Sequence, residues 1–486
     1  MTHNQMITSS STTWTPIDKW VLYALICLAL ARITALLMTP LSLGVDEAQY
    51  WVWSQNLDFG YYSKPPFIAW LIGLSHGLFG HTSWAVRLPA PLLQFAISLV
   101  LWRAARLLFT ASAGRIAAIL WSVMPAVGLG GLVISTDTPL LFFWSVGLVC
   151  LITSEQRHHQ TRQLIFAAGL AAGCAMLSKY AALYFLLGAA LYLILTMKKR
   201  ASHLLPPLLA GFVIAASPNL LWNLANGFVT FQHLGENANL SVPSYSLAEL
   251  GRFLGGQFFV FGPLTLGLAF IALYRQKTAR LFLTCFSLPV LVIMCVQAFL
   301  KEANANWAVS AYPAITILLA GWLSSAPGLR HWISRTGLLA IAINAGLVAV
   351  VTVSVALGDF GRFTPKSDPL RRLRGWDMLA ADMIPHIDAY QVKTILADSR
   401  AAAAILPFHL YPRDIIVRVF DHDNHPTNHF ERAYNFTKDS VKPTLAITAP
   451  DSRPVPDFVT WTGPIGQSNV AISARRQRSK IFFISQ

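Results

Sequence analysis

The sequence predicts an all-α polytopic membrane domain of about eleven transmembrane helices, followed by a small C-terminal α/β domain outside the cytoplasm. Three observations lead to this fold class. The 486-residue chain is 55% hydrophobic and has a mean hydropathy of +0.51. Only 12% of its residues are charged, whereas soluble domains average about 25%. Beyond residue 358 the long apolar runs stop and a charged region begins.

The net charge of +15 raises the question of a nucleic-acid partner. The apolar background favours another origin, because the cytoplasmic loops of membrane proteins are enriched in lysine and arginine and lie against anionic lipid. We therefore expect a protein embedded in membrane lipid that has no nucleic-acid partner.

Apolar runs of about 17–25 residues predict the individual spans. The first run follows a polar segment, 1–19, with no convincing small-residue cleavage site, so we expect a retained anchor rather than a signal peptide. The runs 164–178 and 180–197 could also form one broken segment. The predicted spans are 20–38, 88–108, 116–134, 138–154, 164–178, 180–197, 204–222, 253–274, 281–299, 306–323 and 337–357.

Charged loop residues predict the orientation of these spans. If the N-terminus is cytoplasmic, arginines and lysines gather in the cytoplasmic loops, and most acidic residues before 358 lie on the outer side. The predicted domains are then a cytoplasmic tail (1–19), a transmembrane domain (20–357) and a C-terminal domain on the outer side (358–486), which would be periplasmic in a bacterial inner membrane. The cytoplasmic clusters are Arg103, Arg106 and Arg115; Arg157 and Arg162; Lys198, Lys199 and Arg200; Arg275, Lys277 and Arg280; and Arg330 and Arg335.

Alternating short strands and helices in 358–486 predict that this region forms a small α/β domain on the outer face. The pattern is regular enough to give individual elements. The predicted helices are 377–386 and 400–410, and the predicted strands are 394–397, 415–420, 444–448 and 481–485.

The segment 44–66, directly after the first span, carries the strongest candidates for chemistry. It opens with adjacent carboxylates, Asp46 and Glu47, in a part of the chain where acids are scarce. One interpretation makes Asp46 a helix N-cap with Gln49 as its capping-box partner. Another, compatible with the first, makes Asp46 a general base that takes the proton of an attacking hydroxyl. Glu47 could orient an acceptor, bind a metal or be solvated.

Aromatic side chains follow the two acids. By default they form an interfacial belt, although Tyr50 and Tyr62 could stack on a sugar. The segment ends in Lys64-Pro65-Pro66, and prolines there favour an abrupt helix start. Lys64 would either snorkel to the interface or, beside a helix N-terminus, bind phosphate. The belt residues are Tyr50, Trp51, Trp53, Tyr61 and Tyr62.

Asp137 and Lys179 interrupt stretches that are otherwise apolar. Asp137 lies in an outer Ser-Thr-Asp-Thr-Pro turn, where Thr138 as a cap and Pro139 at a helix start account for the turn without it. An acid that the turn does not need is a candidate second catalytic carboxylate. Lys179 could snorkel or make a second phosphate contact.

Two outer segments supply weaker candidates. His233 and Glu236 share a helix face by their spacing and could bind a divalent metal. Asn304 and Asn306 open a later span, where their amides could hydrogen-bond sugar hydroxyls or cap a helix. No P-loop, glycine-rich nucleotide motif or Ser-His-Asp order is present, so a nucleotide-activated donor has no recognisable site and no cofactor beyond the metal is expected.

Taken together, four motifs resemble the membrane glycosyltransferases of the GT-C superfamily. The nearest groups are the bacterial relatives of the protein O-mannosyltransferases, the lipid A aminoarabinose transferases and the rhizobial lipopolysaccharide galacturonosyltransferases. The resemblance covers the whole membrane part and the transition to the C-terminal domain. The motifs are Asp46-Glu47 after the first span, Lys64-Pro65-Pro66, the Thr-Asp-Thr-Pro turn at Asp137 and the Leu-Ser-Lys-Tyr segment at Lys179.

The resemblance implies an inverting transfer of a sugar from a polyprenyl-phosphate donor at the outer face of the bacterial inner membrane. Asp46 would be the catalytic base, and Asp137 would position the acceptor or a metal. Lys64 and Lys179 would contact the donor phosphate, which leaves as a dianion and so needs cations nearby.

The acceptor implied by the resemblance is lipid A or a lipopolysaccharide core glycan. A protein O-glycosyltransferase of the same fold is one alternative. A lipid-linked sugar flippase or other transporter is another, although such a protein is expected to carry polar residues near mid-membrane and repeat symmetry. The 44–66 segment is shorter and more aromatic than its counterpart in the aminoarabinose transferases, so the donor sugar does not carry over from them.

Overall fold

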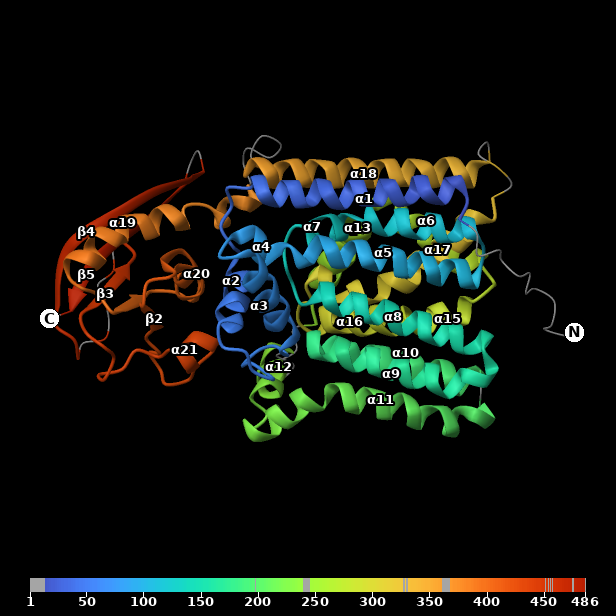
Figure 1. The fold of residues 1–486 in the computed structure, drawn as a ribbon, viewed down its shortest axis with the longest axis horizontal. Coiled ribbons are helices and arrows are strands. Elements are labelled where there is room, and N and C mark those ends of the chain that lie inside the picture. Colours follow the sequence, from blue (N-terminus) through green and yellow to red (C-terminus); the bar gives the residue numbers. More distant parts are fainter. Residues whose placement is uncertain are drawn as a thin grey trace, which may run out of the picture. The chain divides into compact units, whose positions relative to one another are not determined.

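The computed structural model describes residues 14–485 except 197, 239–244, 327, 329–330, 361–367, 451, 453, 455, 457 and 474–475. Its contacts divide the chain into two compact units, which are described separately below (Figure 1). The helical unit comprises Met1–Thr34, Leu88–Asn226 and Leu234–Thr352; the mixed unit comprises Ala35–Arg87, Gly227–His233 and Val353–Gln486.

Within the described residues, eight helical stretches are long and apolar enough to cross a membrane, or up to nine if one bent pair is a single span. This confirms the predicted polytopic helical domain. The helices of this part are α1 (Pro16–Met38), α5 (Pro89–Leu108), α6 (Ala111–Ser122), α7 (Pro125–Gly130), α8 (Asp137–Gln156), η1 (His158–Gln160), α9 (Thr161–Ser178), η2 (Tyr180–Ala182), α10 (Leu183–Thr196), α11 (Lys198–Ala225), α12 (Val229–Ala238), α13 (Leu247–Phe261), α14 (Pro263–Arg275), α15 (Arg280–Cys285), α16 (Leu288–Leu300), η3 (Ala305–Ala311), α17 (Tyr312–Ser324) and α18 (Trp332–Leu357).

Three of the eleven predicted spans are not among these eight stretches. The run 116–134 is divided between α6 and α7 just before Pro125, because a proline has no N–H to continue a helix. The run 253–274 bends by 99° between α13 and α14, where Gly262 has a φ of +100° that favours glycine. The run 180–197 becomes α10, which has 14 residues.

Glycines allow α9 and α11 to pack closely inside the helical unit, where Figure 1 shows the two helices side by side. A Cβ at Gly169 would lie 2.0 Å from the carbonyl oxygen of Leu208, and one at Gly211 would lie 2.2 Å from that of Phe166. Small residues are the usual means by which helix backbones approach each other in lipid. These positions therefore do not tolerate a larger side chain without moving a helix.

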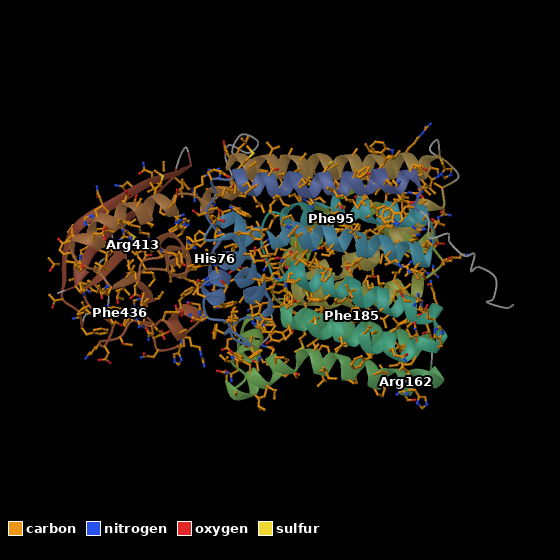
Figure 2. All side chains as sticks on the ribbon, viewed as in Figure 1. His76, Phe95, Arg162, Phe185, Arg413 and Phe436 are labelled. Atoms are coloured by element: carbon orange, nitrogen blue, oxygen red, sulfur yellow. The ribbon has the colours of Figure 1, made fainter. Side chains whose placement is uncertain are left out.

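Aromatic side chains fill the interior of the same unit. The ring of Phe185 (labelled in Figure 2) lies 5.2 Å from that of Trp144 and 5.0 Å from that of Phe286. Gly147 makes room for it, because a Cβ there would come within 2.6 Å of the Phe185 ring. This packing links α8, α10 and the turn after α15.

The mixed unit contains a five-stranded sheet in the order β2-β1-β3-β5-β4. β1 pairs in parallel with β2 and β3, whereas β5 is antiparallel to β3 and β4. The predicted α/β domain is thus confirmed, including each of its predicted strands and helices. Its elements are η4 (Pro369–Leu373), α19 (Trp376–Ala389), β1 (Thr394–Ala397), α20 (Arg400–Leu410), β2 (Ile416–Val419), α21 (His429–Ala433), β3 (Thr444–Thr448), β4 (Trp461–Ser473) and β5 (Arg476–Ser485).

The strand β4 was not predicted from the sequence. It contains Gly463-Pro464, which is typical of a turn, and it forms an edge strand, where proline is tolerated. One side of the sheet covers a small core formed by Leu396, Phe436 and their neighbours; Phe436 is labelled in Figure 2.

The segment after α1 belongs to this mixed unit and not to the helical unit. It forms α2 (Val45–Ser54), α3 (Phe67–Phe79) and α4 (Ser83–Arg87). The apolar helix α3 was not among the predicted spans. Within the unit, α2 packs on α20 and on α3.

Candidate active site

The first turn of α2 carries the adjacent carboxylates, but its cap differs from the prediction. The helix begins at Val45 with Gly44 as its N-cap. The carboxylate of Glu47 accepts the backbone N–H of Gly44 at 2.8 Å. The prediction that Asp46 caps this helix with Gln49 as its partner is therefore wrong, and both side chains are available for other contacts.

Glu47 forms a buried ion pair with Arg87, the last residue of α4. Their side chains are 3% and 1% exposed, and Arg87 Nη2 lies 2.7 Å from Glu47 Oε2. The guanidinium also donates to the carbonyl oxygens of Leu41 and Ser42. The interpretation of Glu47 as a solvated side chain is therefore wrong. Removing one partner of such a pair leaves a buried charge and costs about 3–5 kcal/mol.

Asp46 points away from that pair and is held by α20. Its side chain is 67% exposed, and its Oδ1 accepts a hydrogen bond of 2.6 Å from Nη2 of Arg400. The same guanidinium donates to Oε1 of Gln49 from both Nε and Nη2, at 3.2 and 3.0 Å. Within the described residues, Oδ2 of Asp46 accepts no hydrogen bond. One carboxylate oxygen is thus fixed, and the other is open to a substrate hydroxyl.

The five aromatic residues of the predicted belt are buried inside the mixed unit. The rings of Trp53 and Tyr61 stack at 4.6 Å, and the hydroxyl of Tyr62 donates to the carbonyl oxygen of Pro426. Burial raises the pKa of Tyr61 to about 12, so its hydroxyl stays protonated and donates to the carbonyl oxygens of Trp53 and Asn56. The prediction of an interfacial belt is wrong. For Tyr50 and Tyr62, burial favours packing over sugar contact.

Lys64 occupies the turn that leads into α3. Pro66 is the N-cap of that helix, which begins at Phe67, so the predicted abrupt helix start is confirmed. The carbonyl oxygen of Lys64 accepts the N–H of Tyr61 at 3.1 Å, and the side chain is half-buried. Phosphate binding by Lys64 stays a prediction.

Asp137, Lys179 and Asn306 come together in the helical unit. Lys179 Nζ lies 2.6 Å from Asp137 Oδ1, and Asn306 Nδ2 donates to Asp137 Oδ2 at 3.1 Å. Both charged side chains are less than a quarter exposed. Thr138 does not cap α8 as predicted; Thr136 is the N-cap, and the hydroxyl of Thr138 donates to the carbonyl oxygen of Gly130. The cluster combines a carboxylate, an ammonium and an amide from three elements.

Asn304 is the remaining predicted sugar-binding amide. It is the N-cap residue of η3, but its side chain makes no capping hydrogen bond and is exposed. The other member of that prediction, Asn306, is engaged with Asp137. The structure therefore assigns the two amides different environments.

Comparison with known proteins identifies the family. The family described as dolichyl-phosphate-mannose-protein mannosyltransferase matches residues 63–222. The lipid A galacturonosyltransferase RgtD of Rhizobium johnstonii is 32% identical over 417 residues, which cover 83% of this chain and 85% of that protein. The chain belongs to this family of membrane glycosyltransferases. The transporter alternative thereby loses its support.

Solved structures agree with this assignment at the level of the fold. ArnT of Cupriavidus metallidurans in the apo state superposes with a TM-score of 0.71 at 15% identity, covering 97% of this chain and 98% of that one. The same ArnT bound to undecaprenyl phosphate gives 0.69 at 17% identity, covering 96% and 98%. The predicted GT-C fold is confirmed, and the glycosyltransferase is a multi-pass membrane protein.

The divalent metal that the sequence suggested stays a prediction for this glycosyltransferase. The side chain of Glu236 lies outside the described residues, and the ring of His233 lies 4.7 Å from that of Tyr62. Among the side chains that the structure describes, no group of three His, Cys, Asp or Glu could hold a metal ion.

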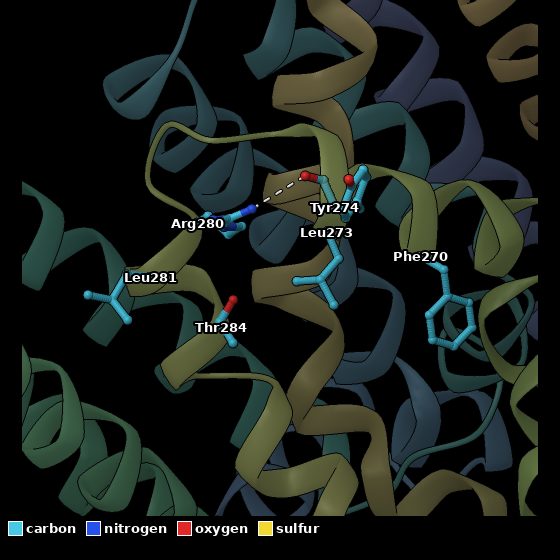
Figure 3. Close-up of a pocket in the computed structure, with 6 residues that line it drawn as sticks. All are labelled: Phe270, Leu273, Tyr274, Arg280, Leu281 and Thr284. Carbon is cyan, nitrogen blue, oxygen red and sulfur yellow. Dashed lines mark hydrogen bonds between the residues drawn. The ribbon is translucent and has the colours of Figure 1, made fainter.

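A surface depression between α14 and α15 is separate from all of these residues (Figure 3). Its wall is apolar apart from Arg280 and Thr284, and Arg280 Nη1 donates to the carbonyl oxygen of Tyr274 at 3.3 Å. None of the predicted site residues lines it. The lining residues are Phe270, Leu273, Tyr274, Arg280, Leu281 and Thr284.

Proposed function

We propose that this enzyme transfers a sugar, with galacturonic acid the first candidate, from a polyprenyl-phosphate donor to lipid A. The observation that carries the proposal is the 32% identity to a lipid A galacturonosyltransferase over most of both chains. The likeness to ArnT, a structure of which contains undecaprenyl phosphate, supports the class of donor. The reaction would take place at the periplasmic face of the bacterial inner membrane.

The geometry of Asp46 suits the role of base. Its Oδ1 is held by Arg400, and its Oδ2 would take the proton of the acceptor hydroxyl. The acceptor oxygen would bond to the anomeric carbon as the bond from that carbon to the phosphate oxygen breaks on the opposite face, so the configuration inverts. The electron pair of the broken bond would leave with the polyprenyl phosphate, which becomes a dianion.

The departing dianion needs cations, and Lys179 and Lys64 are the proposed ones. In the structure, Lys179 is paired with Asp137, so a donor phosphate would compete with this carboxylate for the ammonium. Asn306 donates to the other oxygen of Asp137 and would keep that carboxylate in place during the exchange. Asp137 would then be available to position the acceptor or a metal.

The proposed orientation rests on charge. The N-terminal tail 1–19 would be cytoplasmic, and the domain 358–486 would be periplasmic, because the loops rich in lysine and arginine alternate with acid-bearing ones. Asp46, Lys64, Asp137 and Lys179 would all lie on the outer side, where lipid A is presented.

A protein acceptor is the second candidate. It is favoured by the match of residues 63–222 to the protein mannosyltransferase family. That match covers only residues 63–222, whereas the identity to the lipid A enzyme extends over 83% of the chain. Lipid A is therefore the acceptor we propose.

Mass spectrometry of lipid A from a deletion strain tests the proposal. We expect a hexuronic acid substituent in the parent strain, its loss in the deletion strain, and its return with the wild-type protein but not with Asp46→Asn. Lipid A that is identical in parent and deletion strains, together with loss of a sugar from a periplasmic protein, would overturn the lipid A assignment.

A further inference from the structure

The loop after β1 occupies a special place in the sheet of the mixed unit. The chain leaves β1 for β2 on one side and later returns to β3 on the other side, so the strand order reverses at β1. In open parallel sheets, such a reversal at the carboxyl ends of the strands is where ligands and reacting groups are held. Arg400 is the first residue of the helix that follows this loop.

Two contacts fix this loop. Asp398 forms an ion pair with Lys480 of β5, and the hydroxyl of Ser399 caps α20 by accepting the N–H of Ala402 at 3.3 Å. Because Asp398 and Ser399, the two residues before Arg400, are both held by these contacts, the backbone that carries the Arg400 side chain is fixed.

The other end of α20 is also held against the segment that carries Asp46. His81 Nε2 donates to the carbonyl oxygen of Phe408 at 2.7 Å, and the Phe408 ring lies 5.2 Å from that of Trp51 on α2. Burial lowers the pKa of His81, so the ring is neutral at physiological pH and its second nitrogen contacts His76 at 3.2 Å. The helix α20 is therefore docked at both ends within the mixed unit.

We propose that Arg400 is a positioning residue for the reaction: it orients the Asp46 carboxylate so that Oδ2 faces the acceptor hydroxyl. This inference rests on the proposed role of Asp46 as the base. Gln49 assists, because its Oε1 accepts hydrogen bonds from both Nε and Nη2 of Arg400 and so fixes the plane of the guanidinium. The C-terminal domain thereby supplies part of the catalytic geometry.

The exposure of the pair separates this role from a purely structural one. The side chains of Arg400 and Asp46 are 42% and 67% exposed, and exposed pairs contribute little to stability. A misplacement of about 1 Å in a reacting group can reduce a rate by about 100-fold. Loss of Arg400 is thus expected to affect the turnover far more than the unfolding temperature.

The chain offers a matched control. Arg413 pairs with Asp388 at 2.6 Å in the same unit, and these side chains are 38% and 57% exposed. Figure 2 labels Arg413 on the C-terminal part of the chain. Arg413→Ala removes an equivalent exposed pair without touching Asp46.

The experiment compares purified full-length variants in detergent, with a polyprenyl-phosphate galacturonate donor and lipid A. We expect Arg400→Ala to reduce kcat by about 10- to 100-fold with little change in KM for the donor. Arg400→Lys should recover part of the rate, because an ammonium can reach Asp46 but cannot also hold Gln49. Arg413→Ala should keep the wild-type kcat, and all variants should unfold near the wild-type temperature.

Combination with Asp46→Asn separates the inference from the function on which it rests. If Arg400 acts through Asp46, adding Arg400→Ala to Asp46→Asn should cost no further rate. A wild-type kcat for Arg400→Ala beside an inactive Asp46→Asn would overturn the positioning role alone, as would equal losses for Arg400→Ala and Arg413→Ala. A wild-type kcat for Asp46→Asn would overturn the proposed base itself.

Discussion

Asp46 and Glu47 are neighbours in the first turn of one helix, and each pairs with an arginine, yet their surroundings are opposite. Glu47 is buried with Arg87 and also binds the start of its own helix. Asp46 is largely exposed and shares the guanidinium of Arg400 with Gln49. The same chemical pair therefore holds the backbone in one case and leaves a carboxylate oxygen exposed in the other.

The comparison shows that burial, and not residue type, determines whether a carboxylate–arginine pair stabilises the fold or leaves an oxygen accessible to a substrate. A buried pair has no room for a substrate hydroxyl and is costly to break. An exposed pair adds about 0–1 kcal/mol to stability and leaves one carboxylate oxygen accessible. Activity and stability should accordingly respond in opposite ways to changes at these two adjacent positions.

The largest expected effect is that of Asp46→Asn on transfer. Loss of a general base reduces rates by about 10²- to 10⁴-fold, whereas the unfolding temperature should stay near that of the wild type because the pair is exposed. Initial rates at saturating donor measure the first quantity, and thermal unfolding in detergent measures the second. An unfolding temperature that falls together with the rate would mean that Asp46 is structural after all.

Glu47→Gln is expected to produce the next largest effect, and on stability. The change strands the Arg87 charge in the interior and should lower the free energy of unfolding by about 3–5 kcal/mol. The yield of monodisperse protein and its unfolding temperature are the measurements, with Asp388→Asn as the exposed control. Adding Arg87→Met should recover part of the loss. A Glu47→Gln protein of wild-type stability but low activity would place Glu47 in the chemistry instead.

A smaller effect is expected for the pH dependence of stability, through the imidazole of His429 in the mixed unit. Burial and the nearby charge of Arg400 lower the pKa of His429 to about 4. The unfolded chain takes up this proton near pH 6.5, so stability is complete above that pH and falls by about 1–3 kcal/mol as the pH drops toward 4.

Thermal unfolding between pH 4 and 7 measures this decline. His429→Asn should abolish this loss of stability at low pH. Arg400→Ala should make the loss smaller, because the positive charge of Arg400 no longer lowers the pKa of His429. If His429→Asn leaves the decline unchanged, another group causes it.

The smallest effect is expected for Tyr62→Phe. The hydroxyl of Tyr62 donates to the Pro426 carbonyl oxygen at 3.3 Å, and loss of such a bond costs about 0.5–1.5 kcal/mol. Because the ring is buried, the transfer rate should stay within about twofold of the wild type. A tenfold loss of rate at unchanged stability would instead indicate that Tyr62 contacts the sugar.

The fold was largely predictable because its signals are local. Apolar runs predicted most of the membrane helices. The alternation of short strand and helix patterns predicted α20 and strands such as β1. Where the sequence misled, the cause was also local. Pro125 and Gly262 lie inside apolar runs and break them, and β4, which contains Gly463-Pro464, was not predicted as a strand.

The candidate site was only partly predictable because its contacts are distant in the chain. The arginine that holds Asp46 is 354 residues away, and the one that buries Glu47 is 40 residues away. No periodicity connects such positions. Asp137 and Asn306 are separated by 169 residues and were singled out independently for their residue types. The contacts of Asp137 with Asn306 and with Lys179 could be found only from the structure.

Chemical rescue with formate tests most directly whether Asp46, and not Glu47, takes the proton. Asp46→Ala leaves a space at an exposed position that a small carboxylate can enter, whereas the space left by Glu47→Ala is closed to solvent. We predict that formate raises the rate of sugar transfer by Asp46→Ala in a concentration-dependent way and does not raise that of Glu47→Ala. Wild-type transfer by Asp46→Ala without formate, or rescue of Glu47→Ala alone, would contradict the account.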